Sequence, residues 1–343
     1  MFIVTIDSGT TNTRVRVCKG NTVIAEASGA VGVRDTAITG SQCVLVQGVR
    51  DVLCQALSQA NVNVECDEMQ ILASGMITSN MGLCEISHIS APVNRDDLAY
   101  GAVQKVLPEI IDHPIWFIPG VKNSVSPVDM ASCEMMDVMR GEETETIGVI
   151  SLFDITGPAL VILPGSHSKF VKLDNNNNIV SSATTIAGEL LSVVTQNTIL
   201  ANSLDHQFTN IIDQEYLLQG AKLCREVGLA RSCFSVRILD LFSQTTLNQR
   251  ANFLLGTILY SDILTIKNSQ ALACEPDSTI VICGKKILKE ALEILIKNDA
   301  FFTGKIIAVD EDNSKPLSVI GAISIAERIN EFNHQPIQRL AGE

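Results

Sequence analysis

The stretch that decides the fold is FIVTIDSGTTNTRVRVCKGNTVIAEASG, residues 2–29. Three runs rich in β-branched residues are separated in it by the turn-forming sequences SGTTN and KGN. Short strands joined by tight turns that contain Gly and Asn pair antiparallel with their neighbours in the chain. The sequence therefore predicts a three-stranded β-meander that begins at residue 2.

The same arrangement is predicted again in the second half of the chain. The apolar segments GVISLF, PALVILPG, KFVKL and IVSSATT lie between residues 148 and 185, and the turn sequences DITG, SHS and DNNNN separate them. We interpret these segments as the strands of a second meander. Because each meander opens one half of the chain, the sequence predicts an α/β protein with two domains, residues 1–148 and 149–343.

Helical and strand patterns alternate after each meander. In the first half, apolar spacing predicts helices over 41–60, 94–110 and 129–147 and strands over 69–77 and 114–121. In the second half, the chain from Gly188 to about residue 270 is predicted to be almost wholly helical. Two further strands, each followed by a helix, are predicted over 279–284 and 305–310.

The composition excludes several classes of protein. Of the 343 residues, 46% are hydrophobic and 18% are charged, which is too apolar for a disordered chain. The net charge of −13 disfavours a nucleic-acid partner and a membrane surface, since both attract clustered Lys and Arg. We expect no signal peptide, and the apolar run 147–164 is interrupted by Asp154, so we expect no membrane span. The ten cysteines form no C-x-x-C pair, which favours reduced thiols in the cytoplasm.

The turn between the first two strands, DSGTTNTR at residues 7–14, has a composition suited to phosphate. Backbone N–H groups and hydroxyls can surround a phosphate there, and Asp7 can hold a hydrated Mg²⁺, which makes it both a metal-binding and a catalytic candidate. A polar hairpin turn without a ligand is the alternative. Neither a Walker A loop nor a G-x-G-x-x-G sequence is present. The residues predicted to bind phosphate in this turn are Gly9, Thr10, Thr11 and Arg14.

DSGTTNTR resembles the first phosphate motif of the sugar kinase, hexokinase and actin superfamily. The resemblance implies two ribonuclease H-like domains with an interdomain cleft that closes on ATP. LPGSHSKFV, residues 163–171, is similar to the second phosphate element of the superfamily, although a Pro-Gly-Ser sequence is also common in turns that bind nothing. The residues that this second element adds to the predicted phosphate site are Gly165, Ser166, His167 and Ser168.

The segment IVICGKKILKEAL, residues 280–292, resembles the adenosine-contacting element of the same superfamily. A glycine between a strand and a helix lets the backbone approach a nucleotide, and a helix N-terminus favours anions. We therefore predict nucleotide contacts at Gly284 and Lys285, and a similar role for Gly188 in TTIAGELLSVV. An ordinary strand-to-helix turn is the alternative.

A more specific pattern is DVMRGEETE, residues 137–145. Together with LPGSHSK, TTIAGELLSVV and ASGMITSNMG, it resembles the 2-dehydro-3-deoxygalactonokinases over essentially the whole chain. The resemblance implies an ATP- and Mg²⁺-dependent kinase that phosphorylates O6 of 2-dehydro-3-deoxy-D-galactonate in galactonate catabolism. Two alternatives are a kinase of another sugar acid or sugar and a non-catalytic nucleotide or sugar sensor. The substrate contacts that we predict are Asn12, Gly75, Met76, Ser79 and Asn80.

Phosphoryl transfer needs a carboxylate that orients and deprotonates the acceptor hydroxyl. Glu142 follows a glycine, as the catalytic Asp does in the larger carbohydrate-kinase family, so the resemblance implies that Glu142 is the base. Glu143 is the competing residue. Arg140 is predicted to be a catalytic-site residue that binds the substrate carboxylate, and its alternative is an ion pair with Glu143 or Asp137.

The remaining histidines lack a partner at metal-ligand spacing, so we interpret them as structural or surface residues: His88, His113, His206 and His334. The expected partners are ATP and a small sugar acid. We expect no nucleic acid and no membrane, and the sequence leaves a homodimer open.

Overall fold

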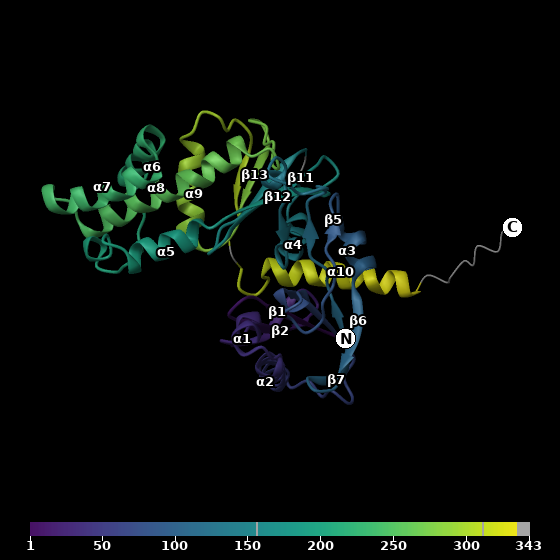
Figure 1. The fold of residues 1–343 in the computed structure, drawn as a ribbon. Coiled ribbons are helices and arrows are strands. Elements are labelled where there is room, and N and C mark those ends of the chain that lie inside the picture. Colours follow the sequence, from purple (N-terminus) through teal and green to yellow (C-terminus); the bar gives the residue numbers. More distant parts are fainter. Residues whose placement is uncertain (156, 311, 335–343) are drawn as a thin grey trace. The chain divides into compact units, whose positions relative to one another are not determined.

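The computed structural model describes residues 1–155, 157–310 and 312–334. Contacts within the chain divide it into two compact units, and Figure 1 shows the elements of both. Unit 1 contains Met1–Lys122, Val138–Asp154 and the segment from Asp312 onward, and unit 2 contains Asn123–Asp137 and Ile155–Glu311. Each unit therefore combines segments that are distant in the sequence.

The sheet of unit 1 is six-stranded, with the order β3-β2-β1-β4-β7-β6. The first three strands are antiparallel to one another, which confirms the first meander, and β4 and β7 continue the sheet parallel to β1. The strands of this sheet are β1 (Phe2–Ser8), β2 (Thr13–Lys19), β3 (Thr22–Gly29), β4 (Met69–Gly75), β6 (Val103–Leu107) and β7 (Ile111–Phe117).

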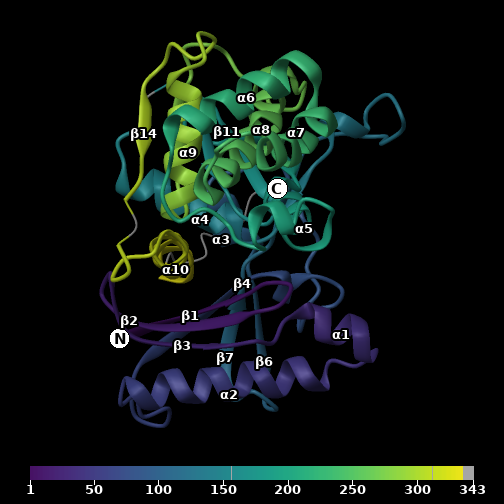
Figure 2. The same cartoon turned by 90° about the vertical axis from the view of Figure 1, so that its left-hand side faces the viewer.

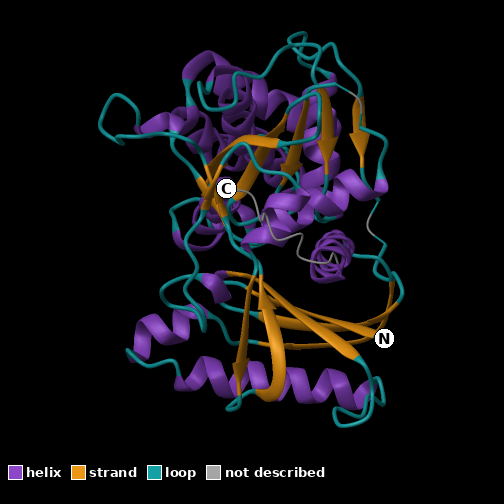
Figure 3. Cartoon of the chain, turned by 90° about the vertical axis from the view of Figure 1, so that its right-hand side faces the viewer, coloured by secondary structure: helices purple, strands orange, loops and turns teal. Residues whose placement is uncertain are grey.

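Helices cover both faces of this sheet. Helix α2 packs against β2 and β3, whereas α10 packs against β1 and β4 and also against α4, as Figure 2 and Figure 3 show from opposite sides. The helices of unit 1 are α1 (Val33–Thr39), α2 (Cys43–Gln59), the single turn η1 (Met76–Thr78), α3 (Arg95–Gly101), α4 (Glu142–Leu152) and α10 (Leu317–His334). A small separate sheet has the order β5-β8-β9 and consists of Ile89–Ser90, Val121–Lys122 and Val138–Met139.

Unit 2 has a five-stranded sheet with the order β12-β11-β10-β13-β14. Its first three strands form the second meander, and β13 and β14 are parallel to β10. The strands of unit 2 are β10 (Ala159–Leu163), β11 (Ser168–Leu173), β12 (Ile179–Thr185), β13 (Thr279–Ile282) and β14 (Ile306–Ala308). Both units thus place the third, second and first strands of a meander beside two parallel strands, which is the ribonuclease H-like arrangement that the resemblance implied.

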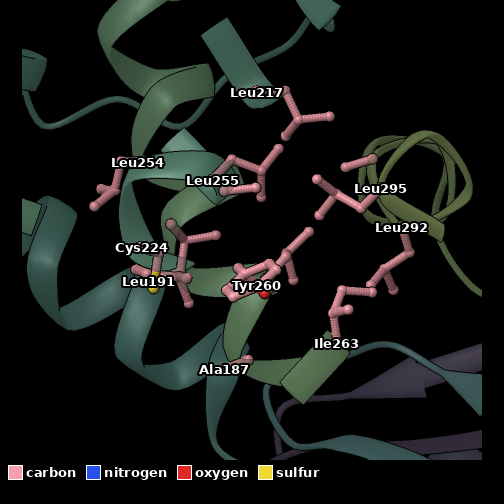
Figure 4. Packing of buried hydrophobic residues seen from close by; sticks show 14 of the residues in the cluster. Ala187, Leu191, Leu217, Cys224, Leu254, Leu255, Tyr260, Ile263, Leu292 and Leu295 are labelled. Atoms are coloured by element: carbon pink, nitrogen blue, oxygen red, sulfur yellow. The ribbon is translucent and has the colours of Figure 1, made fainter. Parts of the chain in front are cut away.

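Long helices supply the core of unit 2. Side chains from α5, α6, α8 and α9 meet in one apolar cluster, and Figure 4 shows ten of them with labels, including Leu191, Leu217, Tyr260 and Leu292. The helices of unit 2 are η2 (Cys133–Met135), α5 (Ala187–Asn197), η3 (Asn202–Leu204), α6 (Gln214–Val227), α7 (Leu229–Phe242), α8 (Leu247–Asn268) and α9 (Lys286–Lys297).

Three predicted elements were wrong. GVISLF was expected to be a strand, but residues 148–152 belong to α4 and the second meander begins at Ala159. A helix was expected over 129–147, yet α4 begins only at Glu142, because Gly141 has a φ of 110° that no α-helix contains. The helix expected over 94–110 ends at Gly101 and is followed by β6.

The division of the chain differs from the single boundary at residue 148. That residue lies inside α4, whose partner α10 comes from the C-terminal part of the sequence. The close packing depends on two glycines, because a Cβ on Gly148 would lie 2.1 Å from the Leu317 carbonyl oxygen and one on Gly321 would lie 1.8 Å from that of Thr144. Helix α10 is therefore part of unit 1.

All ten cysteines are free thiols. Within the ranges that the structure describes, no helix combines the length and the apolar character needed to cross a membrane.

Candidate active site

The centre of the candidate site in unit 1 is Asp7, the next-to-last residue of β1. Asp7 pairs with Arg14 on β2 and with Ser74 on β4, so it lies in the middle of the sheet at the point where β1 and β4 end. The next residue of β4, Gly75, has a φ of 90°, and a Cβ there would lie 2.7 Å from the Ser8 carbonyl oxygen and 3.3 Å from Asp7 Oδ1. Only glycine can therefore bring this backbone so close to the Asp7 carboxyl.

A second glycine brings the start of α4 to the same point. Gly141 precedes the helix with a φ of 110°, and a Cβ on it would lie 3.4 Å from the Cα of Gly75. The ends of β1 and β4 and the N-terminus of α4 therefore converge at Asp7, Gly75 and Gly141. We call this arrangement the glycine junction.

The first turn of α4 carries three carboxyl groups whose environments differ. Glu143 is completely buried, and its two carboxyl oxygens accept hydrogen bonds from the Gly141 N–H at 2.9 and 2.8 Å. The Glu142 carboxyl accepts one from the Arg140 N–H at 3.0 Å. Glu143 therefore stabilises the turn before the helix, whereas Glu142 and Glu145, three residues apart, occupy one helix face.

Burial raises the pKa of three carboxyl groups at this junction, those of Glu143, Glu145 and Asp7. Burial raises the pKa of Glu143 to about 7, and the charge of Glu142 adds to the effect. Burial likewise raises the pKa of Glu145 to about 8, with Asp7 and the other two glutamates contributing and Arg16 opposing. Burial also raises the pKa of Asp7, against the charges of Arg16 and Arg14. At pH 7 Glu145 is therefore mostly protonated and Glu143 about half protonated.

Arg140 is held in a fixed orientation beside this cluster. Its guanidinium donates to the Thr78 hydroxyl at 2.7 Å and to the Ile86 carbonyl at 2.8 Å, and a third contact of 3.4 Å reaches Nδ1 of His88. Burial, Arg140 and Lys122 lower the pKa of His88 to about 4, so this histidine is neutral at physiological pH. Among the described residues, no carboxylate forms a salt bridge with Arg140, and the predicted alternative partner Asp137 pairs instead with Lys169 at 3.2 Å.

Hydrogen bonds from the start of α1 hold the backbone of the predicted phosphate turn in place. The Gly9 N–H donates to the Asn12 carbonyl at 2.9 Å, which closes the turn. The N–H groups of Val33 and Arg34 donate to the carbonyls of Gly9 and Thr10. The side chains of Thr10, Thr11 and Asn12 remain exposed, and Arg14 is half-exposed with Glu26 at 3.6 Å. The turn is therefore rigid in its backbone and open on its outer side.

The predicted substrate contacts after Gly75 lie on η1 and the loop that follows it. Met76 is partly buried and Asn80 is exposed. The Ser79 hydroxyl is buried and donates to the Met76 carbonyl at 2.7 Å, so it serves the loop itself. Met76 and Asn80 are therefore better placed than Ser79 to reach a ligand.

In unit 2, the hairpin between β10 and β11 packs tightly on the start of α5. The Glu189 N–H donates to the Ser166 carbonyl at 2.8 Å, and the Glu189 carboxylate lies 3.1 Å from His167 Nε2. A Cβ on Gly188 would lie 2.0 Å from the Gly165 carbonyl oxygen, so only glycine fits there. Ser166 and His167 are exposed. The predicted hairpin and Gly188 are thus neighbours.

Gly284 joins this hairpin to a cavity. Gly284 has a φ of 86° and packs against Pro164, since a Cβ on it would lie 3.0 Å from that ring. A cavity of about 510 Å³ extends from Gly284 along α9 to the end of β14. Lys285 occupies the N-cap position of α9. Charged residues of α9 and Asp310 line the cavity, whose full lining is Gly284, Lys286, Lys289, Glu290, Glu293, Ala308 and Asp310.

The predicted residues therefore form two groups. Unit 1 brings together Asp7, the turn at residues 9–14, Gly75 and Arg140 with Glu142. Unit 2 brings together the hairpin with Gly188, Gly284 and Lys285. Sequence reasoning missed Glu145, whose spacing of three from Glu142 was an available signal. It also missed His88 and Thr78, for which the sequence offers no signal because they contact Arg140 only through the fold.

Comparison with known proteins agrees with these observations. Residues 7–302 match the family DGOK, described as 2-keto-3-deoxy-galactonokinase. The chain is 26% identical over 265 residues to "Probable 2-dehydro-3-deoxygalactonokinase DgoK1" of Rhizobium meliloti (strain 1021), with 76% of this chain and 79% of that protein covered. A crystal structure of a Sinorhizobium meliloti protein assigned as a 2-dehydro-3-deoxygalactonokinase has the same fold, with a TM-score of 0.73 and 24% identity over 95% of this chain and 99% of that one.

The chain thus has two α/β units, each built on a β-meander, and shares its fold with the Sinorhizobium meliloti protein. The chain belongs to the 2-keto-3-deoxy-galactonokinase family. It is therefore a kinase, a phosphotransferase with an alcohol group as acceptor, which confirms the family and the activity that the sequence resemblance implied.

The carboxyl cluster predicts a pH-dependent effect on stability. Below pH 4.5, the ordinary pKa of a glutamate, Glu145 is protonated in both the folded and the unfolded chain. Between pH 4.5 and about 8 the unfolded chain releases this proton while the folded chain keeps it, so stability falls as pH rises through that window. Glu145→Gln cannot ionise, so its melting temperature should gain on that of the wild type from pH 5 to pH 8 and then run parallel to it.

Melting temperatures measured by circular dichroism across this pH range test the prediction. Glu109→Gln serves as the control, because it removes a carboxyl of unit 1 that is exposed to solvent and therefore not buried. A Glu145→Gln difference that stays constant from pH 5 to pH 9 would contradict the inferred environment of Glu145.

Proposed function

We propose that this kinase transfers the γ-phosphoryl group of ATP to O6 of 2-dehydro-3-deoxy-D-galactonate. The family supports the kinase activity and this substrate. The observation that carries the mechanism is the glycine junction, where the Asp7 carboxyl and the carboxyl-rich first turn of α4 meet. Phosphoryl transfer requires a metal on the phosphates and a carboxylate at the acceptor hydroxyl. The glycine junction offers one carboxyl that could hold the metal and others that could contact the hydroxyl.

We infer that Asp7 holds Mg²⁺. Its oxygen donor is of the kind that Mg²⁺ prefers. Mg²⁺ keeps several waters and uses few protein ligands, so one carboxylate together with substrate phosphates can hold it. When bound, the ion would neutralise charge on the transferring phosphoryl group.

We assign the role of general base to Glu142. Glu143 is excluded from contact with a substrate by its complete burial and its hydrogen bonds to Gly141. Glu142 is only partly buried and lies at the N-terminus of α4, where it can accept the proton of the acceptor hydroxyl. Arg140 would bind the substrate carboxylate, since Thr78 and the Ile86 carbonyl hold its planar donor group in one orientation.

The nucleotide contacts are proposed unit by unit. In unit 1, the backbone N–H groups of Thr10 and Thr11 with the side chain of Arg14 would bind phosphate oxygens, while the Gly9 N–H closes the turn. In unit 2, the exposed turn 165–167 would bind phosphates, and the adjoining cavity beside Gly284 would accept the nucleoside. We therefore assign the sugar acid and the first phosphate turn to unit 1, and the second hairpin and the nucleoside to unit 2. Ten free cysteines support action in the cytoplasm.

A coupled assay of ADP release over a panel of 2-keto-3-deoxy sugar acids tests the proposed substrate. We expect turnover to be fastest with 2-dehydro-3-deoxy-D-galactonate, and ³¹P NMR of the product should show a phosphate ester at C6. A faster reaction with another sugar acid would overturn the substrate. ATP binding without turnover on any member of the panel would favour the alternative, a nucleotide sensor.

The assignment of the base predicts a specific kinetic defect. Glu142→Gln should lower kcat by roughly 10²–10⁴-fold, because the amide cannot accept a proton in the transition state. The affinity for ATP should change little, since the proposed nucleoside cavity lies in unit 2. Steady-state kinetics and calorimetric titration with ATP measure the two effects.

Glu143→Gln is not a neutral control, because Glu143 stabilises the turn at Gly141. The exposed Glu109→Gln provides the matched carboxyl-to-amide control and should retain the wild-type kcat. If Glu142→Gln kept a kcat within a few-fold of the wild type, the base would be another group, and Glu145 on the same helix face would be the next candidate.

A further inference from the structure

Asp262 of α8 is a buried acid that the proposed mechanism does not use. Its side chain is fully buried, and Oδ1 accepts a hydrogen bond from the Thr185 hydroxyl at 2.6 Å. The Ser168 side chain also interacts with this carboxyl and lowers its pKa. Within the described part of the chain, Oδ2 has no hydrogen-bond partner. Burial raises the pKa of Asp262 to about 6, so the group is predominantly ionised at pH 7.5.

Thr185 and Ser168 lie side by side at one end of the predicted phosphate hairpin, on the neighbouring strands β12 and β11. Ser168 is the first residue of β11 and directly follows the turn 165–167. Thr185 is the last residue of β12 and directly precedes the segment that starts α5. These two residues are paired across the sheet. Asp262 on α8 therefore contacts both β11, the strand that leaves the hairpin, and β12, the strand that leads toward Gly188.

An acid at this position is unfavourable for stability alone. Tyr260 and Ile263, its near neighbours on α8, point into the apolar core of unit 2 (Figure 4). Burying a carboxylate costs several kcal/mol unless its hydrogen-bonding capacity is filled, and an apolar residue of similar size is often at least as stable. Here one oxygen stays unpaired, which is rare among buried polar groups in native proteins. The residue therefore needs an explanation other than packing.

We propose that Asp262 is the positioning residue of the phosphate hairpin, which it holds in one geometry through its hydrogen bond to Thr185 on β12 and its contact with the paired Ser168, where β11 leaves the hairpin. The proposal rests on the proposed function, in which this hairpin binds the phosphates of ATP. It also assigns a role to Ser168 that differs from direct phosphate binding. Ser168 is buried and interacts with Asp262, so we assign phosphate binding to the backbone N–H groups of the hairpin and to the exposed Ser166 and His167.

The test compares variants of the full chain in calorimetric titrations with Mg-ATP. Asp262→Leu removes the hydrogen bond to Thr185 and the interaction with Ser168 at similar volume and should weaken ATP binding by about 10–100-fold, the range seen when residues that orient a binding group are lost. Asp262→Asn keeps an acceptor oxygen and should restore affinity to within about threefold of the wild type. Thr185→Val removes only the hydrogen bond from Thr185 to Asp262, a smaller change than Asp262→Leu, and should weaken ATP binding by roughly threefold or more.

Thr257→Val is the matched control. Thr257 is also a buried polar residue of α8, but its hydroxyl bonds the Gly220 carbonyl at 3.2 Å, between α6 and α8. This variant should leave the affinity for ATP unchanged whatever it does to the melting temperature. KM for the sugar acid should stay at the wild-type value in every variant, because Asp262 acts on the nucleotide hairpin alone.

The outcomes separate the two proposals. If Asp262→Leu and Thr185→Val both bind ATP as the wild type does, or lose affinity only as far as Thr257→Val does at an equal loss of melting temperature, Asp262 has no positioning role. If Asp262→Leu fails to fold, Thr185→Val and the recovery in Asp262→Asn decide the question. If the wild-type protein itself does not bind Mg-ATP, the proposed function fails rather than the role of Asp262.

Discussion

The contact between two glycine backbones at Asp7 is the constraint on which the site depends. Gly75 ends β4 with a φ of 90° and Gly141 begins α4 with a φ of 110°, and neither conformation suits a residue with a side chain. A Cβ on Gly75 would collide with the Ser8 carbonyl, and the positive φ of Gly141 lets the helix start beside the end of the central strand. Asp7 and the first turn of α4 are brought together by backbone geometry, and the Glu143 carboxyl then holds the Gly141 N–H in place.

Both units bury carboxyl groups that are unfavourable for folding. In unit 1, Glu143, Glu145 and Asp7 all have a raised pKa, with burial as the largest cause. In unit 2, Asp262 is buried beneath the hairpin with one oxygen unpaired. Stability alone favours apolar residues at such positions, whereas a site for Mg²⁺ and polyphosphate needs charges and fixed donors. The two groups of acids therefore occur at the two places where the sequence predicts contact with ATP.

Much of the fold could be predicted because it depends on local patterns. The meander at residues 2–29 and the helix at 41–60 follow from alternation and from helical spacing, and the structure has both. GVISLF was assigned to the wrong element because a continuous apolar run has no period that separates a buried strand from a buried helix. The first residues of this segment, Gly148 and Val149, are buried because α4 packs closely on α10, an element that the sequence places more than 150 residues later.

The candidate site divides in the same way. Asp7, Arg140 and Glu142 stand in contiguous motifs, so the sequence could propose them. The sequence assigned no site role to His88 or Asp262, because their contacts with Arg140 and with Thr185 exist only in the folded chain. The exclusion of Glu143 as the base likewise needed the structure, because adjacent glutamates differ only in where the helix directs them.

The measurement that tests the glycine junction most directly is the turnover of Gly141→Ala, with folding checked by circular dichroism. An alanine at a φ of 110° is strained, so the start of α4 must shift relative to Asp7. A displacement of about 1 Å at a reacting centre lowers the rate by roughly 100-fold, and we predict a kcat loss of this size with calorimetric ATP affinity within about threefold of the wild type. A folded Gly141→Ala protein with wild-type kcat would contradict the account.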